Sequence, residues 1–200
     1  FGVEKGAGDA TDFFIINKLK GPIFNNFDIG SYLDYRLYPK EKVFVDGRPE
    51  AYPASFFQET YIPMQLDEHK FDIQDQKYHF NTIFLSHTDQ TPWAEEFLKK
   101  IMLSKKWNLA YLDSTSLILT KSNDIKAKIN TDYSDIPSLI QLARFFQFVN
   151  LADEEIKIYQ KILSHDPTHC LVLYNLALKL QKIQDPSFPI FVSRFNQNCQ

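Results

Sequence analysis

The sequence lacks a long hydrophobic run, a strong excess of charge and a framework of cysteines. Its uninterrupted apolar stretches, such as residues 13–16, fall far short of the ~20 residues of a membrane-spanning helix, so these residues contain no such helix. The net charge of −3 argues against a nucleic-acid partner, because a phosphate backbone requires a basic surface. Two cysteines, Cys170 and Cys199, are too few for a disulfide scaffold, and the sequence leaves their pairing open.

The motifs of several enzyme classes are also missing. The chain has neither a G-x-G-x-x-G nor a Walker sequence that would cradle a phosphate. It lacks the G-x-S-x-G elbow of an α/β-hydrolase. The histidines are scattered, without His-x-x-x-His or Cys-x-x-Cys spacing, so we expect no metal site and no cofactor.

What is present describes a globular chain. Hydrophobic residues make up 44% and charged residues 24% of the 200 positions, a balance that excludes intrinsic disorder. The length allows one large domain or two small ones. Because the chain starts at Phe1-Gly2 with neither an initiator Met nor a signal peptide, we expect a fragment of a longer protein.

Residues 1–122 alternate between helical and strand patterns. Short apolar or β-branched runs predict strands at 22–26, 42–46 and 82–86, and a closing hairpin of 109–112 with 116–120. Helical spacing predicts a helix capped by Asp9, one over 29–37 capped by Asp28, one over 53–61 and one over 93–103, with 63–80 less regular. The fold class predicted for this part is therefore three-layer α/β, a mixed sheet flanked by helices.

Residues 123–135 are polar and predict a linker, and residues 136–200 predict an all-α tail with a tetratricopeptide-like (TPR-like) repeat of 34 residues. Glu155 departs from the repeat, because it occupies a slot that normally holds a small residue. A short, irregular last helix is expected over 187–195, after Asp185-Pro186. The slots of the repeat that do match hold Leu139, Leu142, Ala143, Phe146, Tyr159, Ile162 and Leu163, then Leu173, Leu176, Ala177 and Leu180.

The densest group of polar side chains follows the first two predicted strands. If these strands are parallel, both sets lie at the same edge of the sheet, where ligands usually bind. His87 follows the third strand and is a further candidate for that edge. The candidate binding or structural residues are Asn25, Asn26, Asp28, Asp46, Arg48, Glu50 and His87.

Two interpretations of this polar group compete. Asp28 or Asp46 is suited to be an acid, a base or a metal ligand, and Arg48 to hold an anion through two hydrogen bonds. In the structural interpretation Asp28 caps its helix, Asp46 forms a turn with Gly47, and Arg48 pairs with either carboxylate. We expect the structural interpretation to hold and assign no catalytic residue.

The stretch 21–52 carries the most specific local pattern, and the similarity extends more weakly to residue 120. It resembles the soluble C-terminal region of multi-spanning bacterial membrane proteins of the GT-C glycosyltransferase-like type. The matching residues are Phe24, Asn25, Asp28, Gly30, Tyr32, Leu33, Arg36, Leu37, Pro39, Lys42, Val43, Phe44, Asp46, Gly47, Arg48, Tyr52 and Pro53.

The resemblance implies a place and a partner. The fragment would lie on the extracytoplasmic, periplasmic side of the bacterial cytoplasmic membrane, joined before Phe1 to a membrane-embedded portion of its own chain. GT-C catalytic acids are expected in loops between membrane helices, and no catalytic residue transfers to this sequence. The leading hypothesis is a non-catalytic module whose TPR-like helices contact a protein partner.

Two alternatives stay open. The first is a soluble hydrolase or transferase acting on phosphorylated or carbohydrate substrates, with a site around Asp28, Asp46 and Arg48. The second is a soluble TPR adaptor, which would require further repeats.

Overall fold

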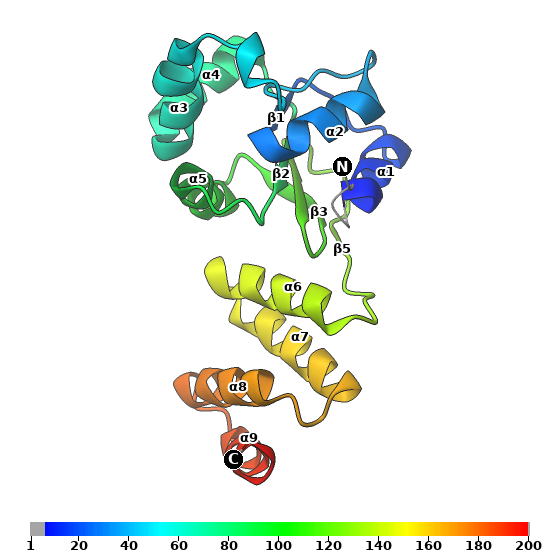
Figure 1. Cartoon of the computed structure of the whole chain (residues 1–200), viewed down its shortest axis with the longest axis vertical. Helices are drawn as coiled ribbons and strands as arrows, with labels where there is room; N and C mark the ends of the chain where they lie inside the picture. Colours follow the sequence, from blue (N-terminus) through cyan, green and yellow to red (C-terminus); the bar gives the residue numbers. More distant parts are fainter. Residues whose placement is uncertain (1–6, 200) are drawn as a thin grey trace. The chain divides into compact units, whose positions relative to one another are not determined.

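The computed structural model describes residues 7–199. It divides into two compact units, named here unit 1, which ends at Asn130, and unit 2, which begins at Thr131. Unit 1 combines a sheet with helices, and unit 2 is built from helices (Figure 1).

Unit 1 contains a five-stranded mixed sheet in the order β1-β2-β4-β3-β5. β4 is antiparallel to both of its neighbours, whereas β1 pairs in parallel with β2 and β3 in parallel with β5. The carboxyl ends of β1, β2, β3 and β5 therefore meet at one edge of the sheet. The strands are β1 (Ile23–Asn25), β2 (Thr82–Ser86), β3 (Asn108–Leu112), β4 (Ser116–Thr120) and β5 (Lys128–Ile129).

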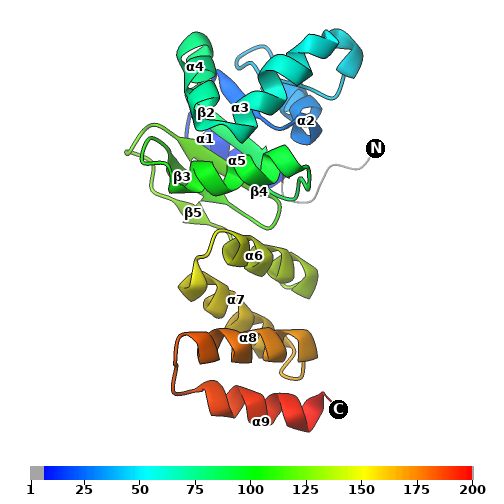
Figure 2. The ribbon, with the colours of Figure 1, turned by 90° about the vertical axis from the view of Figure 1, so that its left-hand side faces the viewer.

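Helices cover both faces of this sheet. On one face, Phe13 and Phe14 of α1 (Ala7–Ile16) and Leu33 of α2 (Phe27–Leu37) form a buried cluster with Phe84 and Tyr111. The other face, toward the viewer in Figure 2, carries α5 (Pro92–Leu103). Side chains alternate along a strand, so Ile23 joins the first cluster while Phe24 points to the opposite face. The prediction of a mixed α/β fold for the first part of the chain is confirmed.

Phe24 is the centre of the second cluster. It has no exposed surface, and its ring lies 5.0 to 5.5 Å from the rings of Phe71, Phe80 and Phe97. Phe71 comes from α4 (Glu68–Tyr78) and Phe97 from α5. Aromatic pairs at these separations add to the free energy of burial, so this face of unit 1 is held by rings from distant parts of the chain.

The predicted strand 42–46 is wrong. Only Val43 makes a single bridge to Ile23, because the next backbone groups bond to a side chain instead of to a neighbouring strand. Asn25 Oδ1 accepts from the backbone N–H of Phe44 at 2.9 Å, and Asn25 Nδ2 donates to the carbonyl of Val45 at 2.7 Å. The β-branched residues therefore correctly indicated an extended segment. They could not indicate that the Asn25 side chain takes the place of a neighbouring strand.

Three further expectations for unit 1 need correction. Residues 63–80 are helical, with α3 (Ile62–Leu66) and α4, and the Asp67 carboxylate caps α4 by accepting from two backbone N–H groups. The helix expected over 53–61 is present from residue 54, but its part Phe56–Tyr61 is π-helical instead of α-helical, and it runs directly into α3. Part of the expected linker 123–135 belongs to the sheet, because β5 pairs with β3.

The caps predicted for two helices also differ. α1 already includes Asp9, so this residue lies in its first turn and is not its cap. Asn26 occupies the N-cap position of α2 and leaves Asp28 inside its first turn. The Tyr61 hydroxyl accepts from the backbone N–H of Phe27 at 2.9 Å, which satisfies one of the free amides at the start of α2.

Unit 2 consists of α6 (Ile136–Phe148), α7 (Ala152–His165), α8 (Cys170–Lys182) and α9 (Phe188–Asn198), and each helix packs against the next. α9 is a regular helix, longer than the irregular 187–195 segment expected. One charged pair is buried between α7 and α8: Glu155 has no exposed surface, and its carboxylate lies 2.5 Å from Lys179 Nζ.

Candidate functional site

Asn26 extends the parallel pairing of β1 and β2 beyond the end of the strands. Its Oδ1 accepts from the backbone N–H of Ser86 at 2.8 Å, and its Nδ2 donates to the Ser86 carbonyl and to Asp89 Oδ2, both at 3.0 Å. Asp89 Oδ1 in turn accepts from the backbone N–H of Thr91 at 2.9 Å. All the polar atoms of the Asn26 side chain are therefore used to join two loops.

Asn25 makes the same kind of connection on the other side of β1, to the 44–45 backbone described above. Gly30 of α2 makes this approach possible. A Cβ atom at position 30 would lie 2.0 Å from the Val45 carbonyl oxygen and 2.8 Å from Asn25 Nδ2. Glycine is needed here because backbone approaches backbone, and the approach fixes Asp46 next to the start of α2.

Asp46 is buried and closed by Arg48. Asp46 Oδ1 accepts from both the backbone N–H and Nε of Arg48 at 3.0 Å, and Oδ2 pairs with Nη2. The Asp46 backbone N–H donates to the Tyr52 hydroxyl at 3.1 Å. The Arg48 guanidinium holds the pKa of the Asp46 carboxyl below its usual range. The two side chains therefore form an ion pair that stabilises the turn between them.

Asp28 and Glu50 stand apart from this pair. Both are exposed, Asp28 in the first turn of α2 and Glu50 in the turn Pro49–Ala51. Partial burial and the neighbouring Asp89 carboxylate raise the pKa of Asp28. Of the two carboxylates expected as partners of Arg48, only Asp46 pairs with it.

His87 lies at the carboxyl edge, bonded to the β3–β4 turn. Its Nε2 donates to the carbonyl of Asp113 at 2.9 Å, and its backbone N–H donates to the carbonyl of Thr115 at 2.8 Å. Burial lowers the pKa of His87 to about 4, so the ring is neutral near pH 7 and holds two loops together.

The sheet edge therefore carries two separate polar groups, one on either side of β1. Asn25, Asp46 and Arg48 form the first, and Asn26, His87 and Asp89 belong to the second. A small pocket touches only the second group and has room for about one water molecule. In both groups the side chains bond to neighbouring backbone or side-chain atoms.

Two acidic residues at this edge, the buried Asp113 and the partly exposed Asp89, were not predicted from the sequence. Asp113 has no exposed surface, and its Oδ1 accepts from the backbone N–H groups of Thr115 and Ser116 at 2.8 and 2.7 Å. Burial raises its pKa. The Asp-Ser-Thr sequence between two strands is the turn signal that pointed to it. Asp89 had no comparable signal, because its partner Asn26 lies 63 residues away.

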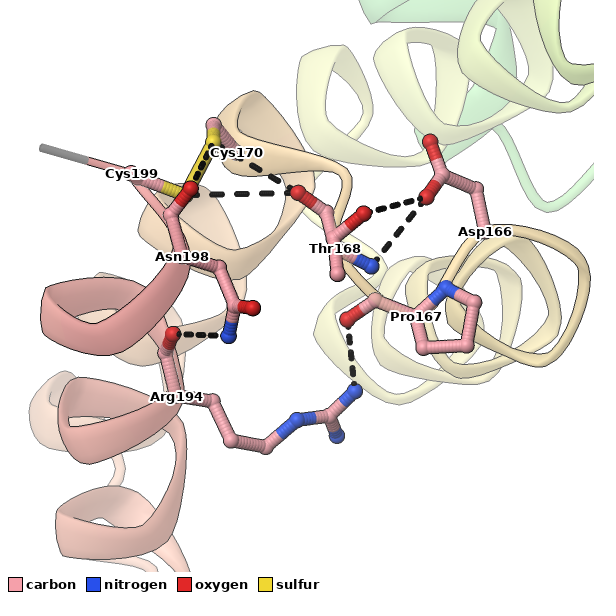
Figure 3. Close-up of a disulfide and its surroundings, with 7 residues drawn as sticks. All are labelled: Asp166, Pro167, Thr168, Cys170, Arg194, Asn198 and Cys199. Carbon is pink, nitrogen blue, oxygen red and sulfur yellow. Dashed lines mark hydrogen bonds between the residues drawn. A yellow bond between two sulfur atoms is a disulfide. The ribbon is translucent and has the colours of Figure 1, made fainter.

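Cys170 and Cys199 form a disulfide with Cα atoms 5.5 Å apart (Figure 3). It ties the start of α8 to the residue after α9, where Arg194 Nη2 also donates to the carbonyl of Pro167 at 2.9 Å. The pairing that the sequence left open is therefore formed.

Across residues 7–199 no helix is long and apolar enough to cross a membrane. Within the same residues, no three His, Cys, Asp or Glu side chains gather where they would hold a metal ion. Comparison of the chain with protein-family models, curated proteins and solved structures yields no match.

Proposed function

We propose that this chain is a non-catalytic, extracytoplasmic module of a membrane-embedded, glycosyltransferase-like protein. The proposal that the module is non-catalytic rests on one observation: most of the candidate side chains are already occupied by hydrogen bonds or ion pairs within the chain. The Asn25 and Asn26 amides bond to backbone groups, and the Asp46 carboxylate is closed by Arg48. Groups occupied in this way position loops and offer no nucleophile, base or free anion-binding site.

The disulfide supports the extracytoplasmic part of the proposal. Structural disulfides persist in oxidising compartments such as the periplasm and are rare in the cytosol. Cys170 and Cys199 are the only two cysteines of the chain, and they are joined. The resemblance of residues 21–52 to the soluble regions of GT-C-like membrane proteins supplies the glycosyltransferase-like context.

Burial in unit 2 supports TPR-like packing. Ala143 and Ala177, 34 positions apart, are both buried where small residues allow close helix contact. Glu155, the departure from the pattern, is neutralised by Lys179. The remaining slots are also buried: Leu139, Leu142, Phe146, Tyr159, Ile162, Leu163, Leu173, Leu176 and Leu180. Such helices are suited to contact a protein partner.

Thiol trapping of the full-length protein in the cells that make it tests the location. Cells are acid-quenched and alkylated before and after reduction, and the number of modified thiols at Cys170 and Cys199 is measured by mass spectrometry. We expect both to be protected until reduction. Complete alkylation without reduction contradicts an extracytoplasmic location, and Cys170→Ser/Cys199→Ser is the control for other cysteines.

A hydrolase or transferase is the second candidate, and the exposed carboxyl of Asp28 beside Asp89 is the observation that favours it. Titration of the chain with hexose phosphates and free hexoses, followed by amide NMR, separates the two functions. Saturable shifts at the Asp28 and Asp89 amides that disappear in Asp28→Asn favour the enzyme. Unchanged spectra favour the module.

A further inference from the structure

The C-terminal ends of α1 and α2 lie side by side on one face of unit 1 (Figure 1). Arg36 of α2 pairs with Asp12 of α1. Beyond both helices, Lys20 pairs with Glu41 at 3.2 Å. The contacts advance in the same direction along both segments, so the two helices run parallel and their last turns meet.

Large apolar side chains are exposed where these last turns meet. Ile16 is 75% exposed, Tyr35 82% and Tyr38 69%. Ile16 lies four residues after Asp12, in the row of α1 that faces α2. Tyr35 lies in the last turn of α2, and Tyr38 is the residue that caps its C-terminal end. All three side chains are therefore exposed at the C-terminal end of the helix pair.

Three lysines frame these side chains. Lys18 and Lys40 follow the two helix ends, are exposed, and have no acidic partner in the part of the chain that the structure describes. Lys20 is 71% exposed while it pairs with Glu41. Asp12 and Glu41 are paired with Arg36 and Lys20, which leaves Lys18 and Lys40 against Asp34 of α2 and an excess of positive charge at this end. The helix-end patch is defined as Ile16, Lys18, Lys20, Tyr35, Tyr38 and Lys40.

We propose that the helix-end patch binds the surface of an anionic phospholipid bilayer. Tyrosine rings favour the headgroup region, isoleucine the boundary with the acyl chains, and lysine ammonium groups extend to the lipid phosphates. The patch combines lysine ammonium groups with tyrosine rings and an isoleucine. A bilayer surface offers phosphates and an interfacial region to these kinds of side chain together, which favours it over a protein ligand. The argument rests on the patch alone and does not require the proposed function.

Co-sedimentation of the 200-residue chain with lipid vesicles tests the proposal. The vesicles contain either phosphatidylcholine alone or phosphatidylcholine with phosphatidylglycerol. We expect binding to the mixed vesicles, weakened by added salt, and little binding to phosphatidylcholine alone. Because each lysine near an anionic surface contributes about a fivefold factor, Lys18→Gln/Lys40→Gln lowers the partition coefficient by about 20-fold or more.

A second variant separates insertion from simple charge attraction. Tyr35→Ser/Tyr38→Ser keeps every lysine, and we expect it to weaken binding as well, because the rings enter the interface. The matched control is Leu103→Ser/Lys105→Gln at the end of α5, since Leu103 is also 82% exposed. This control keeps wild-type binding. Circular dichroism and tryptophan fluorescence verify that every variant is folded.

Several outcomes would overturn the proposal. The first is absence of binding to the mixed vesicles, and the second is an equal loss of binding in the α5 control. The third is full binding by the tyrosine variant, which would show that the chain is attracted by charge alone. Equally tight binding to soluble polyglutamate would instead indicate an acidic protein partner. None of these results changes the thiol-trapping outcome, so the two proposals fail separately.

Discussion

The two units bury polar groups in different ways. In unit 1, single side chains bond to backbone groups that are distant in sequence, as Asn25 does across 20 residues and Asn26 across 60. In unit 2, contacts connect successive helices, and the buried charges Glu155 and Lys179 face each other from neighbouring helices. Contacts in unit 2 therefore join helices that are neighbours in the chain, whereas unit 1 depends on individual residues that bond across long distances in sequence.

Removal of one ring from the aromatic cluster would test this difference most severely. We expect Phe24→Ala to destabilise unit 1 by about 3–5 kcal/mol, because it opens a cavity among the rings of Phe71, Phe80 and Phe97. Both tryptophans, Trp93 and Trp107, lie in unit 1. Urea unfolding followed by their fluorescence therefore reports on unit 1 alone.

The matched control for that variant is Leu142→Ala in unit 2, at a position with no exposed surface. It lowers the stability of the helices measured by circular dichroism and leaves the tryptophan transition in place. A shift of the tryptophan midpoint by Leu142→Ala would show that the two units unfold together, and the comparison between them would lose its basis.

The buried ion pair gives the next largest effect. We expect Lys179→Met to cost about 3 kcal/mol, because Glu155 is left charged and buried without a partner. Hydrogen exchange of α7 and α8 peptides, measured by mass spectrometry, reports this loss. The double variant Glu155→Ala/Lys179→Met removes both charges and restores the small residue that the repeat pattern expects, so protection returns. Equal exchange in the single and double variants would contradict the role of the pair.

His87 makes the stability of unit 1 depend on pH. Its folded-state pKa of about 4 lies below the 6.5 of an unfolded histidine, so the unfolded chain binds the proton first. The contribution of neutral His87 is full above pH 6.5 and is lost as the pH falls toward 4, by about 3 kcal/mol. Urea unfolding of the wild type and His87→Gln across this range measures the difference.

The carboxyls of Asp28 and Asp113 have raised pKa values and act with the opposite sign, because the folded chain then holds the proton more tightly. Their effect is common to the wild type and the His87→Gln variant and cancels in the comparison. Parallel curves for the two proteins would show that His87 does not titrate below its usual range.

The smallest effect is expected at Arg48, because its side chain is 63% exposed. Arg48→Gln removes the cation that lowers the pKa of Asp46, so this pKa rises toward its ordinary value. Stability contributed by the ionised Asp46 is then lost at a higher pH as acid is added. Carboxyl NMR titration measures the pKa directly, with Arg48→Lys as the variant that keeps the charge. An unchanged Asp46 pKa in Arg48→Gln would show that the pair is not formed.

The sequence predicted the parts of the fold in which local pattern and environment agree. The strand 82–86 and the hairpin that follows α5 were found because β-branched and apolar residues fill central positions of the sheet. The helices 63–80 were missed, because α4 is polar along most of its length and buries only Phe71. The polar residues around 25–48 were also found from the sequence, but their division into two groups was not.

The division into two polar groups follows from contacts between residues that are distant in sequence, including the close approach of Gly30 to the Val45 backbone. Arg48 pairs with Asp46 only two residues away, whereas Asn25 bonds to the Val45 backbone across 20 residues, beside the close approach of Gly30 to the Val45 carbonyl. No spacing rule encodes the second contact. The sequence by itself determined the alternating elements, the 34-residue period and the placement of polar residues after strands, because these follow from local periodicity. Only the tertiary structure decided that these polar groups are occupied, since hydrogen bonds across 20 to 60 residues require the completed fold.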